Sequence, residues 1–282
     1  MSAEAAARDA APNAPAAPPQ VDLGWFRRRT TRVVASVVVC VAAFVALSAY
    51  CDFDLLHSLV SIPTAIGWML VNFTPTARAL GYLPYILTQT ISTVLDSVAA
   101  TVISAVIGIV LAVMGSSKTG VDCAPVRTII RVVASIFRNI PMIAWALLLL
   151  LSFKQNEFTG FLALLLTTVG QLTRFFLDTL DEIPGGPIEA LQACGASWWQ
   201  VVFQAGIPLA EAELMSWMLY MAETNVRSAT LIGILTGTGI GFVFNLYYTS
   251  FRYDCAGLVV IVTIVVVLAI EAISNKARRS MI

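Results

Sequence analysis

The chain has 282 residues, of which 58% are hydrophobic and 12% are charged, and its mean hydropathy is +0.83. A soluble domain carries about 25% charged residues, so this composition excludes a soluble enzyme and a disordered protein. The 17 basic and 17 acidic residues cancel, which leaves no positive field to attract nucleic acid. The single histidine and the five cysteines, which have no C-x-x-C spacing, predict no metal site, redox motif or cofactor.

The N-terminal part of the chain divides into an Ala- and Pro-rich tail and an apolar region. Residues 1–24 are rich in Ala and Pro, cannot bury a core, and predict a disordered cytoplasmic tail. Residues 25–84 are predicted to contain the first transmembrane helix, over the charge-free run Val33–Tyr50 that follows an arginine cluster at 27–32. We interpret the apolar segment Leu55–Phe73 as interfacial or re-entrant, because a histidine, a proline and several polar residues interrupt it.

Residues 85–282 contain five further apolar runs that are long enough to be transmembrane spans. These runs are Tyr85–Met114, Val132–Phe153, Phe158–Leu177, Leu209–Leu235 and Ala256–Ile273. With the first run they predict an all-α integral membrane protein of six transmembrane helices. Two spans are interrupted by polar residues or proline: Arg138, Asn139 and Pro141 in one, and Glu223, Asn225 and Arg227 in the other.

The distribution of Lys and Arg predicts that both termini are cytoplasmic. With the N-terminus inside, the inner flanks contain Arg27, Arg28, Arg29, Arg32, Lys118, Arg127, Arg131, Lys276, Arg278 and Arg279. The outer loops contain Arg78, Lys154 and Arg252. A seventh span at Leu55–Phe73 would put the two basic ends on opposite sides, so we do not assign one there.

The cytoplasmic loop of residues 178–208 is too long for a minimal connection, and it predicts two short helices around a turn. Pro187 suits the first position of a helix, and Gly195 suits a helix end with positive φ. Ser197 and Gln200 have the spacing of a capping box for a second helix. That helix would present an apolar surface made of Trp198, Trp199, Val202 and Phe203. Such a surface indicates either a docking element or a segment lying on the bilayer.

The same loop resembles the EAA loop of ABC-importer permease subunits, whose pattern is E-A-A-x3-G-x9-I-x-L-P. Glu189, Ala190, Gly195 and Pro208 match this pattern. Leu191, Ala205 and Ile207 depart from it. The resemblance implies that residues 178–208, called the coupling loop below, dock an ATPase, with Trp198 on the docking surface.

Further motifs are similar to phosphonate-type permeases over roughly Tyr85 to Arg279. They are Arg138-Asn139-Ile140-Pro141, the run Asp181-Glu182-Ile183, and the block Glu223-Thr224-Asn225-Val226-Arg227 with its following glycines. The resemblance implies a type I ABC importer permease fold, with residues 85–282 as the permease core. It also implies a homodimer in the bacterial inner membrane, a cytosolic ATPase dimer, and an extracytoplasmic binding protein that delivers phosphonate, phosphate or phosphite. The chain has no nucleotide motif, so a partner must hydrolyse ATP and the subunit is not itself an enzyme.

Charged residues inside a membrane are costly and therefore informative. Glu223 and Arg227 have the i, i+4 spacing of a helical ion pair. In one interpretation they neutralise each other, and Asn225 satisfies a neighbouring helix. In the other, Arg227, Asn225 and Thr230 line a pathway for anions, near the midplane and in a broken helix, with Glu223 limiting how tightly an anion is held.

Arg138 and Asn139 leave a similar choice between lining the pathway and reaching the inner headgroups. Rival classes are a permease for another small solute, a secondary transporter, a membrane-embedded enzyme and a structural scaffold. A secondary transporter would leave the EAA-like loop unexplained. An enzyme would require a cluster of polar catalytic residues that the sequence does not contain.

Overall fold

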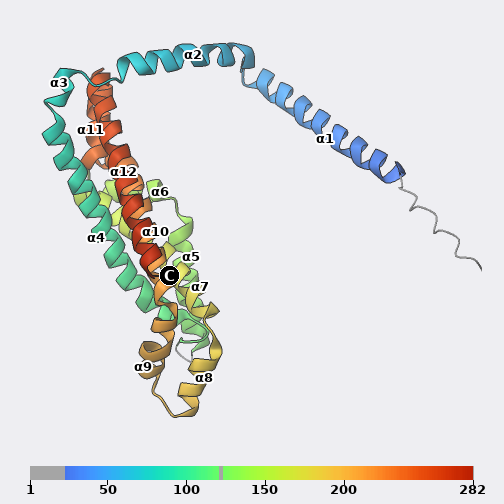
Figure 1. Ribbon diagram of the computed structural model, residues 1–282, viewed down its shortest axis with the longest axis vertical. Coiled ribbons are helices and arrows are strands. Elements are labelled where there is room, and N and C mark those ends of the chain that lie inside the picture. The colour runs from blue at the N-terminus through green and yellow to red at the C-terminus, as the bar shows by residue number, and fades with distance from the viewer. Residues whose placement is uncertain (1–22, 121–122, 282) are drawn as a thin grey trace, which may run out of the picture. The chain divides into compact units, whose positions relative to one another are not determined.

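The computed structural model describes residues 23–120 and 123–281, and Figure 1 shows that its regular structure is helical. The predicted tail lies almost entirely outside these residues. The helices are α1 (Leu23–Tyr50), α2 (Leu55–Asn72), α3 (Ala77–Leu80), α4 (Leu83–Gly115), α5 (Ala124–Asn139), α6 (Met142–Phe153), α7 (Glu157–Glu182), α8 (Gly185–Ala193), α9 (Trp198–Val201), the π-helical turn η1 (Val202–Gly206), α10 (Ile207–Thr236), α11 (Gly239–Thr249) and α12 (Tyr253–Met281). The all-α class predicted from composition is confirmed.

The chain divides into two compact units, with the boundary between Ile66 and Gly67 inside α2, whereas the sequence predicted a boundary at 84–85. In the first unit, α1 has the length and hydropathy of a membrane span, as the run Val33–Tyr50 predicts. The helix α2 also has that length and hydropathy, and it buries no residue within the protein. Its interfacial position therefore stays a prediction.

The second unit is built around α4, α7 and α10. One face of α4 carries small polar residues at helical spacing, and Thr90, Ser97 and Thr101 are buried there. Their hydroxyls donate to carbonyls one turn earlier on α4, so they are satisfied without water. Small residues allow neighbouring helices to approach closely in a membrane. The face of α4 with these three residues therefore packs against protein.

The interruption predicted at Pro141 in the span Val132–Phe153 is confirmed. The span consists of α5 and α6, which meet at an angle of 88°. Ile140 is extended (φ −79°, ψ 119°) because the following Pro141 disfavours the helical conformation and lacks an N–H donor. The indole N–H of Trp145 donates to the carbonyl of Phe137 across this bend, at 3.5 Å.

The expected break around Arg227 is wrong, because α10 is one continuous helix from Ile207 to Thr236. Charged side chains that find partners do not interrupt a backbone ladder. The bend lies further on, at Gly237, which ends α10 with φ +73° and turns the chain by 55° into α11. By length and composition, the described residues contain five spanning helices, or up to seven if each bent pair is one span.

Candidate functional site

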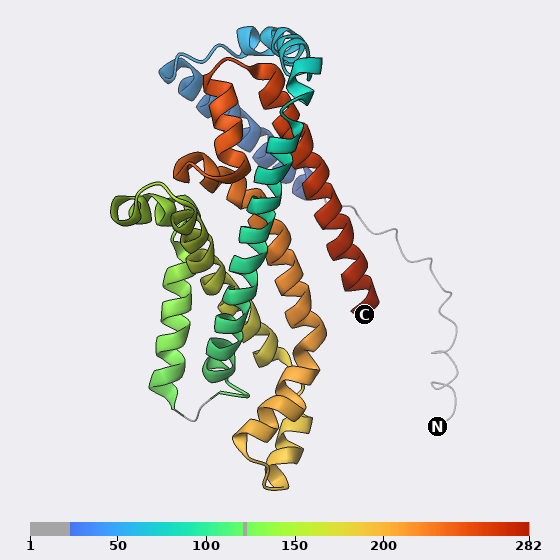
Figure 2. The ribbon, with the colours of Figure 1, turned by 90° about the vertical axis from the view of Figure 1, so that its left-hand side faces the viewer.

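The coupling loop folds as a helix, a turn and a second helix. It forms one extremity of the second unit, where α8 and α9 extend beyond the end of α4 (Figure 2). Gly195 has φ +79°, and its N–H donates to Gln192 while the following N–H donates to Leu191. The Gln200 side chain accepts from the backbone N–H of Ser197 at 2.7 Å. The predicted turn and capping residues are therefore confirmed, although the first helix starts at Gly185 rather than at Pro187.

The second helix of the loop runs into α10 without a break in helical structure. The short helix α9 leads into η1, and η1 leads into α10. Pro208 lies in the first turn of α10, where its ring is compatible with the helix. Helical backbone therefore connects the coupling loop to α10 without an intervening loop.

The residues of the coupling loop face in two directions. Glu189, Ala190 and Gly195 are exposed. Trp199 and Phe203 are also exposed, at 62% and 59%, and their rings stack with centroids 5.9 Å apart. The predicted four-residue apolar surface is wrong in part, because Val202 is buried and the half-buried Trp198 packs against the same core cluster.

Asp181, at the end of α7, connects the coupling loop to the loop between α4 and α5. Its Oδ1 accepts hydrogen bonds from Ser116 Oγ at 2.8 Å, from Ser117 N at 2.6 Å and from Ser117 Oγ at 2.9 Å. Its Oδ2 lies 2.7 Å from Arg131 Nη2 on α5. The Nε of the same arginine donates to the Gly115 carbonyl at 3.2 Å. One carboxylate therefore joins α4, α5 and α7.

Two further hydrogen bonds reinforce this connection. The Lys118 ammonium donates to the carbonyl of Ile183, and Trp198 Nε1 donates to the carbonyl of Thr119 at 2.7 Å. We call Asp181, Arg131, Ser116, Ser117, Lys118 and Trp198 the anchor cluster. Sequence reasoning missed this role of Asp181, because its partners lie about 50 or more positions earlier in the chain. The sequence signal for this role was that Asp181 belongs to the run Asp181-Glu182-Ile183, which resembles phosphonate-type permeases.

Glu223 is buried on α10 and has two arginine partners. Arg227 Nη2 lies 3.0 Å from its Oε1, as the i, i+4 spacing predicts. Arg278 Nη2, from the end of α12, lies 3.5 Å from its Oε2. Sequence reasoning had assigned Arg278 to the inner flank alone, so this link between α10 and α12 was missed.

Asn225 lies inside the helix interface rather than on a water-filled surface. Its amide nitrogen donates to Thr101 Oγ1 and to Thr168 Oγ1, each at 2.9 Å. Its backbone carbonyl oxygen accepts from Ser97 Oγ at 3.4 Å. These contacts join α10 to α4 and α7, and they favour the interpretation in which Asn225 satisfies neighbouring helices.

The other predicted pathway residues are dispersed. Thr230 is half-buried, and its hydroxyl contacts the Val226 carbonyl at 3.4 Å. The backbone carbonyl oxygen of Thr230 lies against Gly241, and a Cβ atom added to Gly241 would lie 1.9 Å from that oxygen. The glycine therefore allows α11 to pack closely on α10. Arg138 and Asn139 are exposed at the end of α5. In the described residues no hydrogen bond or ion pair joins them to Arg227.

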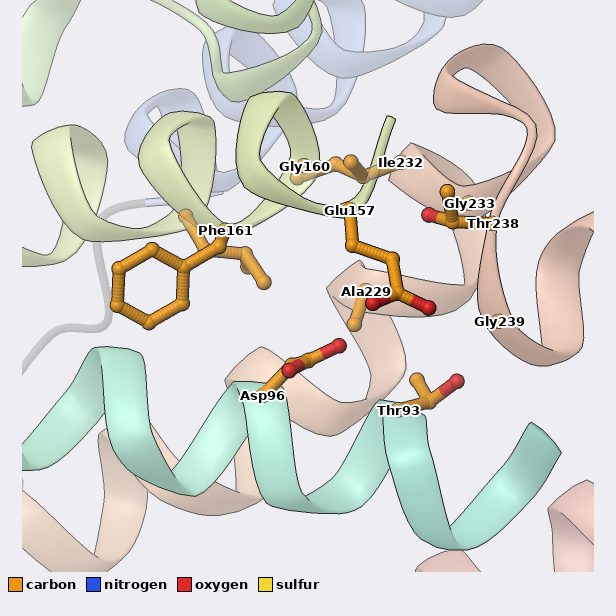
Figure 3. A pocket seen from close by; sticks show the side chains of 11 residues that line it. Thr93, Asp96, Glu157, Gly160, Phe161, Ala229, Ile232, Gly233, Thr238 and Gly239 are labelled. Carbon is orange, nitrogen blue, oxygen red and sulfur yellow. The ribbon is translucent and has the colours of Figure 1, made fainter. Parts of the chain in front are cut away.

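A small pocket lies where α4, α7 and the α10–α11 connection meet. Figure 3 shows the carboxylates of Asp96 and Glu157 pointing toward one another inside it, beside Thr93 and Thr238. Neither carboxylate forms an ion pair within the part of the chain that the structure describes. These residues also include no group of three or more His, Cys, Asp or Glu that could hold a metal ion.

The arrangement is that of a membrane transport component. Residues 104–279 match the family described as the binding-protein-dependent transport system inner membrane component, and the chain belongs to this family. It is therefore an inner-membrane, multi-pass permease component of the ABC importer type.

Two of the relatives are permeases named for phosphorus compounds. The chain is 29% identical over 246 residues to the phosphate-import permease protein PhnE of Mycolicibacterium smegmatis, covering 86% of this chain and 44% of that protein. It is 28% identical over 262 residues to the phosphite transport system permease protein PtxC of Stutzerimonas stutzeri, covering 91% of this chain and 90% of that protein. The chain thus spans less than half of the first relative and most of the second.

Solved structures confirm the predicted type I fold. The inward-facing MetNI methionine ABC transporter aligns with a TM-score of 0.63 at 19% identity, over 73% of this chain and 99% of that chain. A bacterial ABC transporter that imports alginate aligns with a TM-score of 0.61 at 15% identity, over 89% of this chain and 99% of that chain.

Proposed function

We propose that the chain is the permease subunit of an ATP-driven importer for phosphonate or a related phosphorus oxyanion such as phosphate or phosphite. The observation that carries the substrate class is the similarity to a phosphite permease and a phosphate permease over 91% and 86% of this chain. The phosphonate-type motifs around Arg138 and Glu223 support the same class.

In this proposal the subunit forms a homodimer, and each copy docks one subunit of a cytosolic ATPase dimer. The exposed face of α8, with Glu189 and Ala190, contacts the ATPase, and Gly195 sets the angle to α9. ATP-driven closure displaces α8 and α9. Because α9 continues through η1 into α10, this displacement moves α10, and the anchor cluster carries α4 and α5 with it. The access of the pathway then alternates between the two sides.

We assign the anion pathway to the exposed polar groups. Arg227, Arg138 and Asn139 are exposed and offer hydrogen-bond donors, and half-buried Thr230 follows Arg227 on the same helix. Glu223 and Asn225 act as positioning residues, because their side chains are occupied by other helices. An extracytoplasmic binding protein supplies the substrate, and both termini of the permease are cytoplasmic.

The direct test is transport by the complete importer, reconstituted in vesicles with its ATPase and binding protein. Uptake of radiolabelled phosphate, phosphite or methylphosphonate should require ATP, and the three compounds should compete. Glycine betaine and methionine serve as control solutes, because a glycine betaine permease is a more distant relative, at 25% identity over 177 residues. ATP-dependent uptake of a control solute without any uptake of phosphorus oxyanions would refute the substrate class but not the permease function. Uptake driven by an ion gradient alone would favour a secondary transporter.

A further inference from the structure

The group formed by Glu223, Arg227 and Arg278 has a net positive charge. Both guanidinium groups pair with the one carboxylate, at 3.0 and 3.5 Å. Within the described ranges, no other carboxylate forms an ion pair with either arginine. An unbalanced charge at a membrane protein surface is costly unless water or an anion compensates it.

Arg278 also has a buried donor that meets no acceptor among the residues that the structure describes. Its Nη2 donates to Asn275 Oδ1 at 3.1 Å, whereas its Nε is buried and has no partner. On α10, next to Glu223, the buried hydroxyl of Thr224 lacks a partner as well. A buried donor without an acceptor is unfavourable, and more so when it is charged. The exposed part of the Arg278 side chain, 29% of its surface, is the part that an acceptor from outside the chain can reach.

The two arginines are accessible while the carboxylate between them is not. The exposed fraction of the side chain is 48% for Arg227, 29% for Arg278 and 10% for Glu223. The buried Glu223 carboxylate therefore contacts both guanidinium groups on the side that faces the protein. Part of each guanidinium group stays accessible to a ligand on the other side. A ligand that approaches them meets donors rather than the carboxylate.

The position of the group along α12 adds to its positive potential. Arg278 follows Tyr253 by 25 positions, which at the helical rise is about 37 Å and exceeds a hydrocarbon core of roughly 30 Å. Exposed Lys276 and Arg279 lie in the same turn of α12. Such basic helix ends attract anions within about a Debye length of the membrane surface.

We propose that Arg227 and Arg278 form a binding site for a phosphate-type oxyanion at the C-terminal end of α12. Guanidinium groups bind tetrahedral phosphate oxygens through paired donors in a fixed fork. Glu223 sets the separation of the two forks, and its charge prevents very tight binding. The oxyanion is either the phosphodiester of a lipid headgroup or a free phosphorus oxyanion. The site does not require the proposed transport substrate, because a lipid would bind through the same donors.

The test uses the full chain, delipidated in a maltoside detergent that contains no phosphate. Phenylglyoxal modifies accessible arginines, and peptide mass spectrometry gives the modification rate of Arg227. Inorganic phosphate and phosphatidylglycerol are added separately as probes. We expect one of them to slow the modification of Arg227 about tenfold at saturation, since the bound oxyanion occupies the donors of the exposed guanidinium that phenylglyoxal would attack.

Variants separate this site from general attraction to basic residues. Arg278→Gln should weaken protection by the active probe about tenfold or more. Arg279→Gln removes the same charge from the next position of α12, where the side chain is exposed, and should change protection less than about twofold. Arg278→Lys keeps the charge and the contact with Glu223, and should give an intermediate loss. Glu223→Gln should strengthen protection, whereas a purely structural role would predict its loss.

Each outcome decides a separate question. Protection by phosphate assigns the site to a free oxyanion, and protection by phosphatidylglycerol alone assigns it to a lipid headgroup. Absence of protection by both probes would overturn the proposal, as would an equal loss in the Arg278→Gln and Arg279→Gln proteins. Failure of phosphorus-oxyanion uptake in the reconstituted importer would not affect the lipid result, so the two proposals fail independently.

Discussion

Replacement of Asp181 by asparagine tests whether the anchor cluster couples the loop to the transmembrane helices. Asparagine keeps one carbonyl oxygen for the Ser116 and Ser117 donors, but it places an amide N–H₂ opposite the guanidinium of Arg131. The ion pair with Arg131 is lost, and the amide N–H₂ donor of the asparagine faces the N–H donors of the guanidinium. Because the side chains of Asp181 and Arg131 are 22% and 36% exposed, solvent screens part of the effect.

We estimate a loss of about 1–2 kcal/mol, from charged hydrogen bonds discounted for this exposure. For a chain of this size the loss lowers Tm by about 2–8 °C. The matched control is Asp178→Asn, one turn earlier on α7. Asp178 pairs with Arg174 at 2.9 Å on a more exposed surface, so the expected loss is about 0.3–0.5 kcal/mol.

The assay measures thermal unfolding of the purified chain and, in the reconstituted importer, uptake per ATP hydrolysed. We expect Asp181→Asn to lower the ratio of uptake to hydrolysis at temperatures where the protein is folded, and Asp178→Asn to leave the ratio unchanged. If both variants had the same Tm and the same ratio as the unmodified protein, the anchor cluster would have no role in coupling.

Three further predictions address the turn, the topology and the pathway. Gly195→Val should destabilise the coupling loop by about 1–3 kcal/mol, because φ is +79° at this position, and it should reduce uptake. The control is Gly186→Val, at a position that has open space and no positive φ. Equal uptake by the two variants would contradict the docking role. The exposed thiol of Cys194 should react with an impermeant maleimide in inside-out vesicles, and its labelling in intact cells would reverse the proposed orientation. The double replacement Glu223→Gln with Arg227→Gln should fold but lose most uptake, and near-normal uptake at matched expression would exclude Arg227 from the pathway.

Local features of the coupling loop could be predicted because their causes are local. A glycine at a helix end and a serine three residues before a glutamine determine the turn and the cap by short-range hydrogen bonds. The apolar runs likewise predicted the membrane helices from composition. The proline at 141 produced a sharp bend between two helices, and the charges at Glu223 and Arg227 produced none, because only the proline removes a backbone donor.

Contacts between distant segments could not be predicted from one sequence. Asp181 binds residues 64 and 65 positions earlier, and Glu223 binds Arg278 from another helix. Nothing in the spacing of these residues indicates that they meet. For the same reason Asn225 could be assigned to a helix interface only when Thr101 and Thr168 were seen on either side of it.

The π-helical turn η1 joins α9 to α10 and determines how the side-chain faces of these two helices are rotated relative to each other. A π turn takes up one residue more than an α turn, so it absorbs an insertion without rotating the flanking helices. Deleting one residue within Val202–Gly206 would convert η1 to an α turn and leave the faces of α9 and α10 nearly in phase. A deletion in α10 between Ile207 and Arg227 would instead rotate the stacked Trp199 and Phe203 by about 100° relative to Arg227. The orientation of the docking surface relative to Arg227 is thus insensitive to the loss of one residue in η1 and sensitive to it in the part of α10 that precedes Arg227.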